Sequence, residues 1–186
     1  MREKTPRSLS VAELEDVLRT ALEGRYGFRD ALLISILYHH CMRASEVIEL
    51  KVSDVEGGRI RINRKQGGFP NEHWLRSAVG KPWLDEERLL CRYLVFRSSH
   101  FDVASDRLFL GQKGHLTRQQ VYNIVRNAAI AAGIHRSKST PRMLKHSGIS
   151  HLIQCGMPVR DASAARPQLR WRQDRRSTLF PPGGLG

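Results

Sequence analysis

One long apolar segment, residues 28–41, most constrains how this 186-residue chain can fold. Apolar residues fill most of it, with Ala31, Leu32, Leu33 and Ile34 in an unbroken run. A helix that is apolar around most of its circumference has to be buried among other elements of the protein. The segment is shorter than the 18 or so apolar residues that a membrane-spanning helix needs, and no such run occurs elsewhere. The segment therefore predicts a buried helix inside a domain.

Further segments with helical periodicity predict that this domain is mostly helical. Ser10 and Glu13 have the spacing of a capping box at the start of the first helix. Thr117 is placed to cap a long amphipathic helix that Gly133 ends, and Pro141 suits the first turn of another. The segments expected to be helical are residues 10–24, 28–41, 44–50, 84–97, 117–133 and 141–156.

A single β-hairpin is expected between these helices. Polar and apolar residues alternate from Arg59 to Asn63, after a glycine pair at residues 57–58. A second glycine pair at residues 67–68 predicts a turn, and residues 72–76 could return as the antiparallel partner. Residues 106–111 are expected to form only a short extended piece. The predicted fold class is mostly α with a small antiparallel β-hairpin (α+β), without internal repeats.

The charge of the chain favours a polyanionic partner. Thirty-one Lys and Arg residues against 18 Asp and Glu residues give a formal net charge of +13. Such an excess is typical of proteins that bind nucleic acid, although a basic protein can also be merely soluble. The first residues lack the apolar core of a signal peptide, so a cytoplasmic location is expected.

The three cysteines predict neither a metal site nor a disulfide framework. Cys41, Cys91 and Cys155 are far apart in the sequence and odd in number. Each lies in an apolar helical context, so three buried thiols are expected.

Arg43 is a candidate phosphate ligand, because it lies between the buried helix and a short helix that follows it. An arginine at such a junction can direct its planar fork into a cleft and grip a phosphate with two hydrogen bonds. Glu46, three residues further on, could hold the start of the short helix or pair with Arg43. Taken alone, the same pattern also fits a surface arginine in a salt bridge with its i+3 neighbour.

Three regions together resemble the tyrosine recombinase (phage integrase) family. Around Arg43 the family shows G-x-R-x-S-E-x-x-x-L-x-x-x-D, which residues 41–54 match except that Cys41 replaces the glycine. The second region is the expected hairpin, and the third runs from residue 108 to the box Thr-Pro-Arg-Met-Leu-Lys-His at residues 140–146. The resemblance covers about residues 8 to 161. It is greatest to the short recombinases that invert fimbrial phase-switch promoters.

This resemblance implies a fold, a partner and a mechanism. The fold would be the family's catalytic domain, and the partner would be double-stranded DNA, bound by a tetramer in the family. A tyrosine attacks the scissile phosphate and forms a phosphotyrosyl bond, without a metal or nucleotide cofactor. Two arginines clamp the phosphate oxygens, and a lysine of the hairpin protonates the leaving oxygen. DNA recombination or integration by strand exchange is the activity that this mechanism serves.

The residues at the family's active-site positions match it only in part. Arg43 matches the first arginine, whereas the lysine position falls on Gln66, with Lys65 one residue before it as the candidate. The family's second box, H-x-L-R-H, has Arg142 in place of its first histidine, and an arginine stays charged and cannot act as a base. Lys145 replaces the second arginine and keeps the charge without the fork. His146 matches the trailing histidine.

The family's nucleophile has no counterpart in the sequence, because no tyrosine follows Tyr122. We expect an N-terminal arm at residues 1–9, a catalytic domain at 10–161 and a basic tail at 162–186. The tail is too poor in aliphatic residues to bury a helix face and is expected to be disordered. Two readings of the tail stay open: a real, divergent segment that binds DNA through its arginines, or a shifted reading frame, in which residues 165–168 could encode the family's Leu-Gly-His. Two functions stay open: an inactive or rescued recombinase, and a DNA-binding regulator that occupies recombination sites without cutting them.

Overall fold

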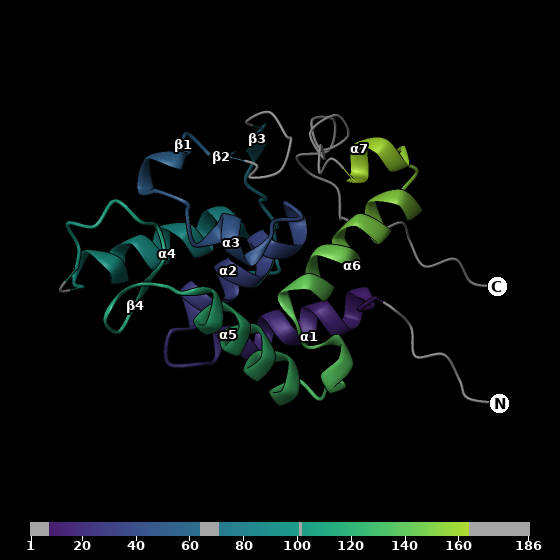
Figure 1. The fold of residues 1–186 in the computed structure, drawn as a ribbon, viewed down its shortest axis with the longest axis horizontal. Coiled ribbons are helices and arrows are strands. Elements are labelled where there is room, and N and C mark those ends of the chain that lie inside the picture. The colour runs from purple at the N-terminus through teal and green to yellow at the C-terminus, as the bar shows by residue number, and fades with distance from the viewer. Residues whose placement is uncertain (1–7, 64–70, 101, 164–186) are drawn as a thin grey trace.

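A computed structural model describes residues 8–63, 71–100 and 102–163 of the chain (Figure 1). Helices predominate, and two small antiparallel sheets lie between them in the sequence. This architecture confirms the predicted fold class. The elements are α1 Val11–Leu22, α2 Gly27–His39, α3 Ala44–Val47, the 3-10 turn η1 Val52–Asp54, β1 Val55–Glu56, β2 Arg59–Ile62, β3 Asn71–Trp74, α4 Glu86–Ser98, β4 Leu110–Gly111, β5 Gly114–His115, α5 Arg118–Ala131, the 3-10 turn η2 Arg136–Lys138, α6 Pro141–Gln154 and α7 Val159–Ser163.

Helix α2 is the central element of the described part, as its apolar sequence predicts. Every residue from Ala31 to His39 is buried. The helices α1, α4 and α6 pack against it from different sides, and α5 closes the same core. None of the helices described by the structure is long and apolar enough to cross a membrane.

The helix ends form where the capping residues predict them. Ser10 and Glu13 form a reciprocal capping box, with Ser10 N donating to Glu13 Oε2 at 2.7 Å. Thr117 caps α5 in the same way with Gln120, and Thr140 caps α6 at Pro141. Such caps satisfy backbone donors that a helix start would otherwise leave unpaired. Local chemistry therefore fixes these three helix starts.

The sheets are more extensive than the sequence predicts. The predicted hairpin is present as the antiparallel pair β2–β3, in which Ile60 lies opposite His73. Strand β1 extends it to three strands through a turn at Gly57 and Gly58, whose φ angles are 57° and 72°. A second hairpin, β4–β5, forms where only an extended piece is predicted. Strands of two residues are too short to show the alternation that identifies a strand. Residues 64–70, which join β2 to β3, lie outside the described residues.

The prediction of three buried thiols is wrong for two of the cysteines. Cys41 is buried, whereas Cys91 is exposed and Cys155 is half-buried. Cys91 lies on α4. Leu89, Leu90 and Tyr93 of this helix face the core, whereas Cys91 faces solvent. Periodicity within α4 is weak, so the sequence alone does not show which of its faces is inside.

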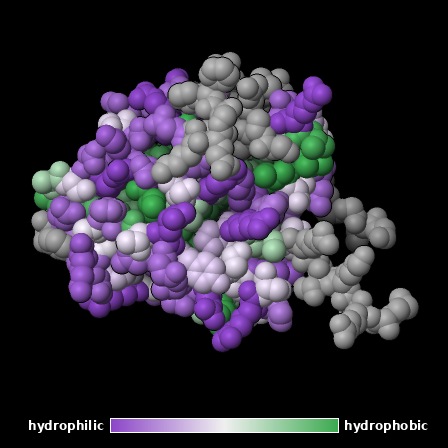
Figure 2. All heavy atoms as spheres, viewed as in Figure 1, coloured by the Kyte–Doolittle hydropathy of each residue, from purple (hydrophilic) through white to green (hydrophobic). Residues whose placement is uncertain are grey.

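The surface of the described part is mainly hydrophilic on the face shown in Figure 2. A smaller hydrophobic patch lies beside α7, where the side chain of Val159 is exposed. Helix α7 itself crosses the expected boundary at residue 161, and most of the predicted tail (164–186) lies outside the described residues.

Candidate nucleic-acid interface

The C-terminal end of α2 and the turn that follows it form the centre of the candidate site. His40 ends α2, Cys41 and Met42 are buried, and Arg43 is the N-cap of α3. Cys41 reverses the chain with a φ of 49°, in the left-handed region that glycine occupies without strain. The glycine of the family pattern at this position therefore has a conformational reason. Cys41 adopts the same backbone conformation at a cost of about 1–2 kcal/mol.

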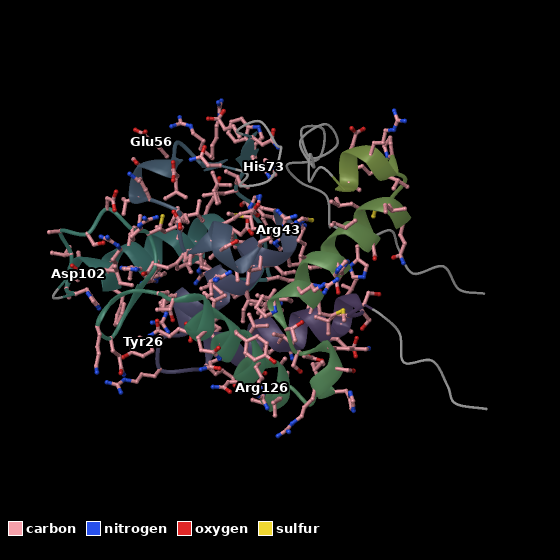
Figure 3. All side chains as sticks on the ribbon, viewed as in Figure 1. Tyr26, Arg43, Glu56, His73, Asp102 and Arg126 are labelled. Atoms are coloured by element: carbon pink, nitrogen blue, oxygen red, sulfur yellow. The ribbon has the colours of Figure 1, made fainter. Side chains whose placement is uncertain are left out.

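Arg43 is held at this turn by the carboxylate of Glu46. The backbone N–H of Arg43 donates to Glu46 Oε2 at 2.8 Å, and its Nη1 lies 3.5 Å from Glu46 Oε1. The Glu46 side chain is buried, whereas that of Arg43 is 44% exposed (Figure 3). Glu46 therefore holds the start of α3 and also pairs with Arg43, the two roles that the sequence predicts for it. Much of the guanidinium is left open to solvent and to an anionic ligand.

Helix α6 lies directly against this end of α2. A Cβ atom added at Gly148 would lie closer than 3.0 Å to the carbonyl oxygen of Tyr38 and 3.0 Å from Sγ of Cys41. The Tyr38 hydroxyl is also hydrogen-bonded to Nδ1 of His151 on α6. Lys145 lies one helical turn before Gly148, on the same side of α6. The fold thus brings the turn of Arg43 and the first half of α6 into one region of the molecule.

The predicted residues on α6 lie at or near its surface. Lys145 is half-buried, whereas Arg142 and His146 are exposed. Arg142 Nε donates to His146 Nε2 at 3.4 Å across one turn of the helix. The two predicted residues of this box therefore contact each other at the surface of α6.

The predicted leaving-group lysine cannot be placed, because Lys65 and Gln66 both lie outside the described residues. The strand leading to them carries the exposed Arg59 and Arg61. Arg59 donates to Glu72 at 2.8 Å and lies over the Trp74 ring at 4.3 Å. The described part of the hairpin is therefore basic on its outer face.

A buried polar network behind the site was not predicted from the sequence. Its centre is Glu86 at the start of α4, whose side chain is fully buried. Glu86 Oε1 accepts from Ser35 Oγ at 2.8 Å and lies 3.1 Å from His39 Nδ1. Glu86 Oε2 lies 2.9 Å from His40 Nε2 and accepts from Arg76 N at 2.9 Å. The only signal in the sequence is the histidine pair that ends an otherwise apolar helix.

The charges of this network follow from burial and hydrogen bonding. Burial alone raises the pKa of Glu86, but His40 and His39 hold this pKa well below its usual range. Burial lowers the pKa of His39 to about 4, against the opposing effect of Glu86, so His39 is neutral at pH 7. Its Nε2 has no hydrogen-bond partner among the described residues, as a neutral ring protonated at Nδ1 allows. The described residues include no group of three or more His, Cys, Asp or Glu side chains that could hold a metal ion.

The four tyrosines of the chain all lie within the described residues. Tyr38 and Tyr93 are buried with their hydroxyl groups hydrogen-bonded, and burial raises the pKa of both. Tyr26 lies at the opposite end of α2 from Arg43, which for a helix of 13 residues is about 20 Å away. Tyr122 is partly exposed on α5 and precedes the box at residues 140–146, whereas the family's nucleophile follows it.

Comparison with known proteins gives a consistent assignment. The model of the Phage integrase family matches residues 7–165. The type 1 fimbriae regulatory protein FimE of Escherichia coli (strain K12) is 33% identical over 158 residues, which cover 83% of this chain and 76% of FimE.

Two solved structures have the same fold. The XerH site-specific recombinase, bound to a palindromic difH substrate in a post-cleavage complex, superposes with a TM-score of 0.72 at 29% identity. That alignment covers 94% of this chain and 49% of XerH. The XerA recombinase superposes with a TM-score of 0.71 at 22% identity and covers 87% of this chain and 56% of XerA. This chain thus spans about half the length of these two recombinases. The match to the family model and to FimE shows that the chain belongs to the phage integrase family, with the fold of a tyrosine recombinase catalytic domain.

Proposed function

We propose that this protein binds double-stranded DNA at a recombination site, through the face formed by the Arg43 turn, the first half of α6 and the hairpin β2–β3. The observation that carries the proposal is Arg43, which a buried carboxylate holds at an exposed turn directly beside α6. The family assignment supports the same partner, because its member XerH was solved on its DNA substrate.

The chemistry of the face suits a phosphate backbone. Arg43 offers a planar fork for two hydrogen bonds to one phosphate, whereas Lys145 offers a point charge. The exposed Arg61 of β2 would add a further positive charge, and Lys65 is proposed to act at the family's lysine position. Binding by such contacts releases counterions from DNA and therefore weakens steeply as salt is added.

The tyrosines and Arg142 give little support to cleavage by this chain alone. Tyr38 and Tyr93 are buried and hydrogen-bonded, and Tyr26 is at the far end of α2. Tyr122 precedes the box at residues 140–146, which the family's nucleophile follows. Arg142 stands where the family has a histidine, and a guanidinium cannot take up a proton from an attacking group. We therefore propose that the chain, acting alone, occupies DNA without forming a phosphotyrosyl bond.

Strand exchange with a tyrosine supplied by another subunit is the second candidate function. The arrangement of Arg43 with Glu46 favours it, because a phosphate clamp would serve a nucleophile from either source. This function requires a homo-oligomer or a mixed assembly on DNA, as the family's tetramers imply.

Equilibrium binding to labelled duplex DNA containing an inverted-repeat recombination site would test the proposal. Arg43→Ala is expected to weaken binding and to make the slope of log K against log salt shallower by about 1, the loss of one phosphate contact. The matched control is Arg118→Ala, an exposed arginine at the start of α5. It adjoins the β4–β5 hairpin, which contacts the other end of α2 through Gln112 and Tyr26. Equal effects of the two substitutions would contradict the proposed face.

A nicked suicide substrate separates the two candidate functions. A covalent protein–DNA adduct formed by this chain alone would contradict binding without cleavage. An adduct that forms only when an active relative is added, and that carries the relative's tyrosine, would support strand exchange in trans.

A further inference from the structure

The buried network behind Arg43 connects three parts of the fold that are far apart in the sequence. Glu86 on α4 binds His40 at the end of α2, and His40 contacts His73 on β3. These three side chains are almost completely buried. Only two residues separate His40 from Arg43, so the Cα atoms of these two lie within about 11 Å of each other. The network therefore joins the hairpin to the Arg43 turn.

The contact between the two histidines is a hydrogen bond between their Nδ1 atoms. Their Nδ1 atoms lie 3.1 Å apart, so one of them carries the proton of a hydrogen bond. His40 Nε2 lies 2.9 Å from the Glu86 carboxylate, which can only accept. His40 therefore links His73 to Glu86 through its two ring nitrogens.

His73 is also the residue of β3 whose side chain lies in the interior. It is the only buried residue of the four in β3, whereas Glu72 is exposed on the opposite side of the strand. Apolar contacts of this sheet with the core come from the other two strands, through Val55 of β1 and through Ile60 and Ile62 of β2. Apolar packing is non-directional, whereas a hydrogen bond fixes both the distance and the angle between its partners. The bond to His40 is therefore suited to setting where the hairpin lies relative to α2.

We propose that His73 is a positioning residue, which through His40 and Glu86 fixes the basic hairpin β2–β3 beside the Arg43 turn so that both contact the same DNA duplex. The inference rests on the proposed function, because it assigns the hairpin to the same DNA-binding face. The outer side of β2 presents Arg59 and Arg61 to that face. Loss of the bond would leave the core intact and let the hairpin shift against α2.

Two substitutions of His73 separate its hydrogen bond from its bulk. His73→Leu fills a similar space without a donor. His73→Asn is the conservative variant, because its amide group takes nearly the place of Nδ1 and can hydrogen-bond to His40 as donor or acceptor. Ile60→Val is the matched control: it removes one buried methylene directly opposite His73 on β2 and leaves the network untouched.

Two readouts are needed, one with DNA and one without it. Amide hydrogen exchange of the hairpin reports its anchorage, and the amide of Leu75, which donates to Gly58 O at 2.8 Å, is a suitable probe. The salt dependence of duplex binding reports the phosphate contacts. We expect His73→Leu to speed exchange in the hairpin but not in α5, and to make the salt slope shallower by about 1–2. We expect His73→Asn to restore both to wild-type values.

Each outcome decides a different point. Wild-type exchange and salt slope in His73→Leu would overturn the proposal, as would an equal effect of Ile60→Val. An Asn variant as impaired as the Leu variant would show that the hydrogen bond does not position the hairpin. If the wild-type protein bound no DNA, the proposed function would fail; faster exchange confined to the hairpin of His73→Leu would then still establish the anchorage.

Discussion

Gly148→Ala tests the close approach of α6 to α2, on which the geometry of the candidate site depends. In a helix interior with free space, this substitution stabilises a protein by about 1 kcal/mol, because alanine has the higher helix propensity. At Gly148 the added methyl group would meet the backbone carbonyl oxygen of Tyr38 at less than 3.0 Å. A backbone atom inside α2 cannot rotate away, so the two helices have to separate.

The expected loss follows from that separation. Restoring an ordinary contact requires α6 to move by about 1 Å, which weakens the packing of Leu144 and Leu152 and strains the bond from Tyr38 to His151. Overpacking of this kind costs about 1–3 kcal/mol, and with a backbone contact the upper part of that range applies. After subtracting the gain in helix propensity, we expect a net loss of about 2 kcal/mol, or roughly 6 °C in Tm for a domain of this size.

Thermal and urea unfolding of the purified protein measure this loss. Ser150→Ala, a half-exposed position on the same helix, serves as the control and is expected to change Tm by less than about 1 °C. DNA binding should weaken in Gly148→Ala as well, because Lys145 lies one turn away from the displaced contact. A Tm equal to or above that of the wild-type protein would refute the close packing of α6 on α2.

Three further substitutions test the turn and the network. Cys41→Val should lower the free energy of unfolding by at least about 2 kcal/mol relative to Cys41→Gly in urea titrations, because a β-branched residue tolerates a φ of 49° poorly; equal stabilities would contradict the left-handed turn. Glu86→Ala should lower the free energy of unfolding by about 3–5 kcal/mol, because it leaves the buried partners of the carboxylate without their acceptor. A loss below about 1 kcal/mol would contradict the buried network. The folded-state pKa of His39, about 4, lies below its unfolded value of 6.5, so the unfolded chain binds more protons between these values. Stability should therefore fall by up to about 3 kcal/mol as the pH drops from 6.5 to 4, and His39→Asn should flatten that part of the profile measured by urea unfolding; an unchanged profile would contradict a neutral, buried His39.

The helices were predictable because their signals are local. Ser10 and Glu13 are three residues apart, and the capping box they form depends on little beyond α1 itself. The apolar composition of α2 likewise requires burial whatever surrounds it. The β4–β5 hairpin carries no comparable signal: its strands have two residues each, and its position depends on contacts with α2, such as the bond from Arg29 to Leu110 O.

The site was predictable only where its residues are close in sequence. Arg43 and Glu46 are neighbours on one turn of helix, so their pairing follows from the spacing of two residues. The two histidine partners of Glu86 lie 46 and 47 residues away at the end of α2, and His40 and His73 are 33 residues apart. A glutamate in the first turn of a helix, such as the one predicted at 84–97, is normally exposed to solvent and interacts favourably with the helix dipole. Only the tertiary fold shows that this one is completely buried.

The geometry of the proposed phosphate-binding site does not depend on the residues that depart from the family's active-site pattern. The backbone reversal at Cys41, the carboxylate of Glu46 and the close contact at Gly148 determine where the turn of Arg43 and the first half of α6 lie. None of these features depends on the identity of the side chain at position 142 or 145. Arg142 and Lys145, which stand where the family has a histidine and an arginine, can therefore differ from the family without disturbing this scaffold. On this basis Lys145→Arg should strengthen DNA binding by restoring a bidentate phosphate contact, while the same variant should form no covalent adduct on a nicked substrate. A weaker complex, measured by the same binding titration, would show that the position of Lys145 is adapted to a lysine.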